Sequence, residues 1–193
     1  DNPEMIAARE RGIPIIRRAE FMARLLADHS VIAVAGTHGK TTVTSMIAAI
    51  LIEAKLDPLV LVGASVKELG DRNSRAGAGR LAVVEADEYD RSFLALSPYI
   101  AVMTSLEAEH LDIYKDLADL QATFAQFANQ QEPGLTHNGF AVTCIDEPAL
   151  REITPKLTKR IVAYGLRSTE AKYRARDVQH GPGRTRATIL RGA

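Results

Sequence analysis

Residues 31–42 restrict the possible folds of this chain more than any other segment. The apolar run 31–35 predicts a buried strand, which ends at Gly36 and leads through a second glycine into a helix predicted to begin at Lys40. Backbone N–H groups at a helix N-terminus, a lysine ammonium and a threonine hydroxyl together bind the phosphates and Mg²⁺ of a nucleotide triphosphate. A glycine turn that serves packing alone is the alternative, which the preceding strand and the following lysine disfavour. We therefore expect a nucleotide-binding loop made of Gly36, Thr37, His38, Gly39, Lys40, Thr41 and Thr42.

Strand and helix signals alternate along the rest of the chain. Apolar residues recur at helical spacing from Val43 to Ala54, which predicts an amphipathic helix after the loop. Short apolar runs that suit strands covered on both faces occur at 59–62, 81–85, 100–104, 140–145 and 161–164. This order predicts an α/β fold with a doubly wound, mainly parallel sheet, in which ligands bind beyond the carboxyl ends of the strands.

Other segments have less regular patterns. Residues 13–16 are expected to form a short strand, whereas the stretch 63–80, which contains Gly, Ser and Asn, is expected to be a mobile loop. Residues 173–178 and 186–190 are expected to pair as an antiparallel hairpin through the turn 181–183.

Acidic residues follow the predicted strand 81–85, whose carboxyl end should lie beside the loop. Four carboxylates occur within residues 85–90, and a solvated acidic turn that caps a following helix is the ordinary explanation for such a run. The position of this run after a buried strand favours a functional role, so Glu85 is expected to bind Mg²⁺ together with Thr41. The other three carboxylates either cap the next helix or contact the groups around the metal; they are Asp87, Glu88 and Asp90.

His110 follows a third predicted strand, 100–104, among the carboxylates of Glu107, Glu109 and Asp112. An imidazole beside carboxylates can complete a second metal site, and an ordinary hydrogen-bonded histidine explains the same residue equally well. The residue pattern alone leaves these two alternatives open.

Composition excludes several classes of function. The 24 basic residues balance the 24 acidic residues, so charge gives no reason to expect nucleic acid or an anionic membrane as a partner. The single cysteine, Cys144, cannot form an internal disulfide, and no apolar run approaches the length of a membrane span. We therefore expect a cytoplasmic location. We also expect the chain to be incomplete at both ends, because it opens on a turn-like sequence and closes on a predicted strand without a partner.

Three ordered motifs, at residues 36–42, 85–88 and 109–112, resemble the ATP-binding domain of the Mur ligases. The loop contains a histidine, and in this respect it resembles the branch of the family that joins L-alanine to UDP-N-acetylmuramate. The resemblance covers nearly the whole chain and implies that the chain contains parts of two domains. Residues 1–28 would be the tail of an N-terminal UDP-binding domain, and residues 29–193 an ATP-binding central domain truncated at its C-terminus.

The resemblance also implies a reaction and its catalytic residues. The reaction would be ATP-dependent amide formation through an acyl phosphate, in peptidoglycan biosynthesis, with ATP and Mg²⁺ required. Lys40 would hold the β- and γ-phosphates, and Thr41 and Glu85 would bind the first Mg²⁺. His110 would bind a second Mg²⁺ together with Glu85.

One departure from the family pattern is Ser105, which follows Thr104 where many members carry asparagine, so the contact made by that asparagine is in question. The start of the family's UDP-binding domain, the later part of its ATP-binding domain and the C-terminal domain that receives the amino acid are not among these residues, so we expect the fragment alone to be inactive. Three alternatives remain: the recycling ligase that attaches a tripeptide to the same sugar nucleotide, a folylpolyglutamate synthase, and a nucleotide-binding module without ligase chemistry.

Overall fold

The computed structural model describes residues 2–108, 112–130 and 139–192. Its strands, in chain order, are β1 (Ser30–Ala35), β2 (Leu59–Val66), β3 (Arg72–Arg75), β4 (Leu81–Glu85), β5 (Ile100–Met103), β6 (Phe140–Cys144), β7 (Arg160–Gly165), β8 (Tyr173–Gly181) and β9 (Arg184–Arg191). Its α-helices are α1 (Pro3–Glu10), α2 (Arg18–Leu25), α3 (Lys40–Glu53), α4 (Leu117–Asn129) and α5 (Pro148–Ile153). Three short 3₁₀ helices are η1 (Lys67–Leu69), η2 (Tyr89–Ala95) and η3 (Thr154–Lys156).

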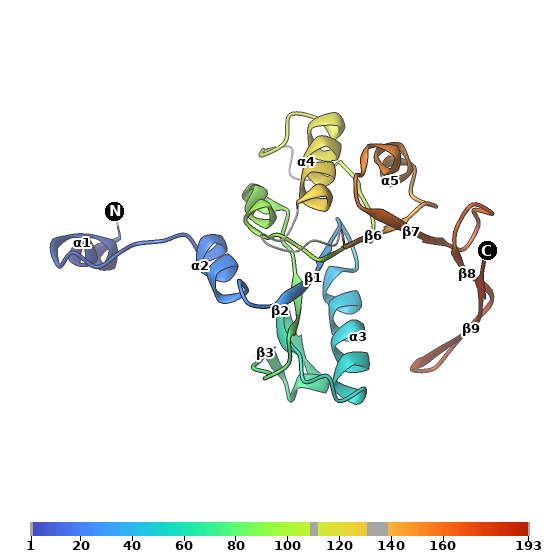
Figure 1. Cartoon of the computed structure of the whole chain (residues 1–193), viewed down its shortest axis with the longest axis horizontal. Coiled ribbons are helices and arrows are strands. Elements are labelled where there is room, and N and C mark those ends of the chain that lie inside the picture. Colours follow the sequence, from blue (N-terminus) through green and yellow to red (C-terminus); the bar gives the residue numbers. More distant parts are fainter. Residues whose placement is uncertain (1, 109–111, 131–138, 193) are drawn as a thin grey trace.

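The strands form one sheet in the order β3-β2-β4-β1-β5-β6-β7-β8-β9. Neighbouring strands from β2 to β8 run parallel, whereas the edge strands β3 and β9 pair antiparallel with β2 and β8. Helices lie on both sides of the sheet (Figure 1). The predicted fold class, an α/β fold with a doubly wound and mainly parallel sheet, is therefore confirmed.

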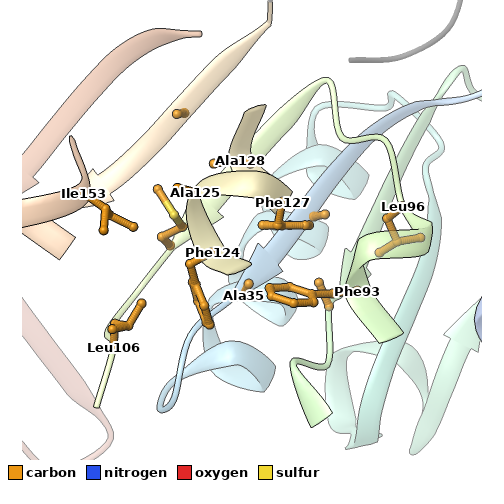
Figure 2. Packing of buried hydrophobic residues seen from close by; sticks show 14 of the residues in the cluster. Ala35, Phe93, Leu96, Leu106, Phe124, Ala125, Phe127, Ala128 and Ile153 are labelled. Carbon is orange, nitrogen blue, oxygen red and sulfur yellow. The ribbon is translucent and has the colours of Figure 1, made fainter. Parts of the chain in front are cut away.

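Alternate residues of the central strand β1 face two different layers, because successive side chains of a strand point to opposite faces. Ile32 and Val34 pack in one cluster with residues of α3, whereas Val31 and Ala33 belong to the cluster under α4 and α5. This second cluster includes three aromatic rings that lie close together between η2 and α4 (Figure 2). The rings of Phe93 and Phe127 stack with centroids 4.7 Å apart, and Phe124 meets Phe93 edge-on at 5.2 Å.

Two expectations about secondary structure are wrong. Residues 13–16 form no strand among the described residues, because no neighbouring strand pairs with them and Pro14 has no N–H to donate. The stretch 63–80 is not a loop throughout, because β2 continues to Val66 and β3 returns alongside it, with Arg75 opposite Val60. The predicted hairpin is confirmed as β8 and β9, which meet at a turn centred on Pro182 and Gly183.

The two N-terminal helices pack little against the sheet. Neither α1 nor α2 has a buried residue, and α1 lies at the far end of an extended arm (Figure 1). Asn2 caps α1 by accepting a hydrogen bond from the backbone N–H of Glu4 at 2.8 Å. Of the helices in the described residues, none combines the length and the hydropathy needed to cross a bilayer.

Candidate functional site

The loop 36–39 joins the central strand β1 to the N-terminus of α3, at the carboxyl edge of the sheet. Gly36 has a φ of 142°, and a Cβ at this position would overlap the hydroxyl of Thr104. Gly39 occupies the N-cap of α3 with a φ of 81°, and beyond its own neighbours in the chain no heavy atom of the described residues lies within 4 Å of where its Cβ would be. The first N–H groups of a helix have no intrahelical acceptor. The loop therefore offers backbone donors beside open space, as an anion-binding site requires.

The segment that follows β5 holds this loop in shape. The hydroxyl of Thr104 donates to the carbonyl of His38 at 2.6 Å, and the hydroxyl of Ser105 accepts a hydrogen bond from the N–H of His38 at 2.9 Å. The hydroxyl of Thr37 accepts from the N–H of Glu107 at 2.9 Å. Ser105, which stands in place of the common asparagine, therefore makes a contact of its own with the loop.

Lys40, the first residue of α3, lies folded over the loop. Its ammonium donates to the carbonyl of Gly36 at 2.7 Å and lies 3.4 Å from the carbonyl of Thr37. It also forms an ion pair with Glu88 at 2.8 Å, in which the side chains are 17% and 4% exposed. Charge-assisted bonds of this length are among the stronger hydrogen bonds in proteins.

Glu85, the last residue of β4, lies against the first turn of α3. Its carboxylate accepts a hydrogen bond from the hydroxyl of Thr41 at 3.0 Å and another from the backbone N–H of Gly63 in β2 at 2.7 Å. The hydroxyl and the carboxylate are oxygen ligands of the kind that Mg²⁺ prefers. Thr42, the next residue of α3, is exposed.

The remaining acidic residues of 85–90 separate into different environments. Asp87 is exposed and accepts a hydrogen bond from the backbone N–H of Tyr89 at 3.1 Å, a local turn contact just before η2. Glu88 is buried and faces Lys40. Asp90 and Arg91 both have φ values near +50°, a strained conformation for residues other than glycine.

Contacts with α4 and the turn before it hold this strained segment. The guanidinium of Arg91 donates to Asp119 at 2.6 Å and to Thr123 at 2.9 Å. Tyr114 is buried and donates its hydroxyl hydrogen to the backbone carbonyl of Glu88 at 2.5 Å. Burial raises the pKa of Tyr114 to about 12, so the phenol stays a protonated donor at neutral pH.

A cavity of about 600 Å³ opens beside Lys40 and Glu85. Its walls also include Gly63 of β2, Phe21 of α2 and Ser74 of β3. The sequence predicted the loop and strand ends that form one side of this cavity. It did not predict the contribution of β3, since that segment was expected to be an irregular loop.

Of the predicted site residues, the loop, Lys40, Thr41 and Glu85 are brought together. His110 lies outside the described residues, so its proposed role stays a prediction. Among the described residues, no three His, Cys, Asp or Glu side chains gather into a metal-binding cluster. A divalent cation here would therefore rest on the Thr41 hydroxyl and the Glu85 carboxylate, with other ligands coming from the nucleotide and water.

The sequence profile of the Mur ligase middle domain matches residues 34–192. The chain belongs to the Mur ligase family. Among curated Mur ligases, it is 48% identical over 180 residues to UDP-N-acetylmuramate–L-alanine ligase of Geotalea uraniireducens, an alignment that covers 93% of this chain and 38% of the relative. The UDP-N-acetylmuramate–L-alanine ligase of Methylobacillus flagellatus is 47% identical over 192 residues, 99% of this chain and 39% of the relative. The chain thus spans about two fifths of the length of these Mur ligases.

A solved Mur ligase structure supports the same assignment. The UDP-N-acetylmuramate–alanine ligase of Thermotoga maritima superposes with a TM-score of 0.82 at 25% identity, and covers 99% of this chain and 41% of that one.

Two groups at the site of this Mur ligase were not predicted. The first is the N–H of Gly63, which holds the Glu85 carboxylate; a glycine directly after a predicted strand at the same sheet edge is the signal that could have found it. The second is the pairing of Glu88 with Lys40. The acidic run marked Glu88 as a candidate, but nothing in the run distinguished it from its neighbours.

Proposed function

We propose that this chain is the ATP-binding part of a ligase that joins L-alanine to the carboxylate of UDP-N-acetylmuramate in peptidoglycan biosynthesis. The observation that carries the proposal is the meeting of Lys40, Thr41 and Glu85 at one sheet edge in a Mur ligase middle domain. The names of its curated relatives support the choice of substrates.

The described residues fit a nucleotide and its metal ion. The backbone donors at the start of α3 suit phosphate oxygens, and Lys40 would donate to the β- and γ-phosphates of ATP. Thr41 and Glu85 would hold Mg²⁺, which when bound neutralises the charge that builds up on the transferred phosphoryl group. We propose His110, with Glu85, as the ligands of a second Mg²⁺.

The proposed chemistry has two steps. A carboxylate oxygen of UDP-N-acetylmuramate attacks the γ-phosphorus of ATP, the bond from that phosphorus to the β–γ bridging oxygen breaks, and ADP leaves. The amine nitrogen of L-alanine then attacks the acyl carbon of the resulting acyl phosphate, loses a proton, and releases inorganic phosphate as the amide forms. The first step brings two anions together, so the cationic side chain of Lys40 would lower the repulsion between the carboxylate and the γ-phosphate.

The division of the chain is part of the same proposal. We assign residues 1–28 to the tail of a UDP-binding domain and residues 29–193 to the ATP-binding central domain. The absence of buried residues from α1 and α2 and the start of the family match at residue 34 support this division. The acceptor and the amino acid would require the neighbouring domains of the full-length ligase, and the reaction would take place in the cytoplasm.

A second candidate function is supported by one specific observation. The chain superposes with a TM-score of 0.79 at 27% identity on the UDP-N-acetylmuramate:L-alanyl-gamma-D-glutamyl-meso-diaminopimelate ligase of Neisseria meningitides, and the match covers 97% of this chain and 60% of that one. A ligase of that class would attach a tripeptide in place of L-alanine to the same sugar nucleotide.

Phosphate release by the full-length protein tests these alternatives. ATP, Mg²⁺ and UDP-N-acetylmuramate are supplied with L-alanine, glycine or the tripeptide in separate reactions. We expect phosphate release with L-alanine, which depends on both acceptor and amino acid. Turnover with the tripeptide but not with L-alanine would favour the second candidate, and release without any amino acid would favour a nucleotide-hydrolysing module.

A further inference from the structure

The ammonium of Lys40 is engaged by oxygens of the protein itself. A lysine ammonium has three N–H donors. In this structure three oxygens lie within hydrogen-bond distance of it: the carbonyls of Gly36 and Thr37 and the carboxylate of Glu88. Lys40 must therefore give up one of these oxygens before it can donate to a phosphate.

Two hydrogen bonds hold the backbone of Glu88 in place. The carbonyl of Glu88 accepts hydrogen bonds from the hydroxyl of Tyr114 and from the N–H of Arg91, at 2.5 and 3.1 Å. These bonds anchor the point from which the carboxylate reaches Lys40. The carbonyls of Gly36 and Thr37 belong to the loop backbone, which the segment after β5 holds in place.

Charge distinguishes Glu88 from the other two acceptors. A carboxylate and a phosphate that share one ammonium repel each other, and the repulsion is weakly screened because the Glu88 side chain is only 4% exposed. A carbonyl carries no net charge and imposes no such penalty. The carboxylate is therefore the partner that an approaching phosphate would displace.

We propose that Glu88 competes with a nucleotide phosphate for the ammonium of Lys40, and so limits how tightly the loop binds nucleotide. This inference rests on the proposed function in so far as the loop must bind a nucleotide. Its consequence is that Glu88 weakens ADP binding and speeds ADP release. The ion pair also means that the ammonium of Lys40, which is only 17% exposed, has a compensating charge when no nucleotide is bound.

The test is the affinity of the full-length protein for ADP in the presence of Mg²⁺, measured by isothermal titration calorimetry. Glu88→Gln keeps the shape and one acceptor oxygen but removes the charge. In the wild-type protein the charge-assisted bond between Glu88 and Lys40 must be broken when ADP binds. Because Glu88→Gln lacks this bond, we expect it to lower the Kd of ADP about tenfold. The matched control is Glu53→Gln, which removes the same charge from an exposed side chain at the opposite end of α3 from Lys40. Solvent screening limits the expected change there to less than about twofold.

The same substitution made in a Lys40→Met protein separates competition for the ammonium from direct repulsion between the Glu88 carboxylate and the phosphate. In Lys40→Met there is no ammonium to compete for, so adding Glu88→Gln should lower the Kd of ADP clearly less than it does when Lys40 is present, because only the repulsion between the carboxylate and the phosphate is then relieved. Equal tightening in both backgrounds would overturn the proposal and indicate repulsion of the phosphate through space. Unchanged or weaker ADP binding by Glu88→Gln would overturn it as well.

Thermal unfolding will show whether Glu88→Gln is folded, and Glu88→Asp provides a second test if it is not. Glu88→Asp keeps the charge but is one methylene shorter, so its carboxylate cannot reach Lys40 in the same way. We expect ADP binding to tighten about threefold, and no tightening would contradict the proposal. If the wild-type protein does not bind ADP at all, the proposed function fails, whereas binding without these changes refutes only the competition.

Discussion

Gly63→Ala offers a sharp test of the position assigned to Glu85. A Cβ on Gly63 would lie 2.8 Å from one carboxylate oxygen of Glu85 and 3.1 Å from the other. Ordinary contacts begin at 3.4 Å, so the carboxylate must move by about 0.6 Å or more. Because the obstructed atoms are the end of a side chain, the carboxylate will move and the sheet will stay intact.

This displacement should separate Glu85 from the hydroxyl of Thr41, with which it now shares a hydrogen bond of 3.0 Å. Disturbing the group that orients a metal ligand typically costs about 10- to 100-fold in metal affinity or activity. We therefore expect the Mg²⁺ concentration for half-maximal phosphate release by the full-length protein to rise about tenfold or more. The midpoint of thermal unfolding should change little, since Gly63 is exposed.

Gly181→Ala is the matched control. It adds the same methyl group to another exposed strand glycine, where the nearest heavy atom would be 3.8 Å away. We expect it to leave the Mg²⁺ dependence unchanged. If Gly63→Ala also keeps the wild-type Mg²⁺ dependence and turnover, the carboxylate of Glu85 does not act where we place it, and the metal assignment is wrong.

Two further predictions concern the support of the loops. Ser105→Ala removes the acceptor for the N–H of His38 and should raise the Kd of ADP about threefold by calorimetry. Ser105→Asn, whose amide oxygen can accept the same bond, should restore it, and equal affinity for all three proteins would contradict the role of this contact. Burial raises the pKa of Asp146, but hydrogen bonds from three backbone N–H groups of residues 166–168 outweigh burial and hold that pKa below its ordinary value. Urea unfolding should therefore show Asp146→Asn to be less stable by about 2 kcal/mol above pH 4, with the difference vanishing as the pH falls through the lowered pKa. A difference independent of pH would refute this explanation.

The loop and its flanking elements were predictable because several local signals agree. An apolar strand, two glycines and a lysine at a helix start lie within twelve residues, and the helix after them repeats apolar residues at the expected spacing. The edge strand β3 has no such signal. Its sequence Arg-Asn-Ser-Arg has no apolar alternation, and it becomes a strand because β2 offers it a free edge.

The side-chain pairings of the site follow from tertiary structure and could not be predicted. The four carboxylates of residues 85–90 look alike in sequence, yet a buried position beside Lys40 falls to Glu88 alone among them. Asp90 and Arg91 adopt positive φ values, which are uncommon for residues other than glycine, and Arg91 is held in place by contacts with a distant helix. Conversely, the apolar residues 13–16 resemble a strand but have no strand beside them to complete a ladder.

The order of the strands also determines when the loop 36–39 can fold while the chain is being synthesised. The loop is made early in the chain, yet its hydrogen bonds lead to Thr104, Ser105 and Glu107, nearly 70 residues later. These bonds cannot form until residues 104–107 have been synthesised and have left the ribosome, and contacts so distant in sequence form slowly. A ribosome must therefore release β4 and β5 before the loop can adopt its binding shape, so a nascent chain that ends before residue 107 would carry the motif without the site.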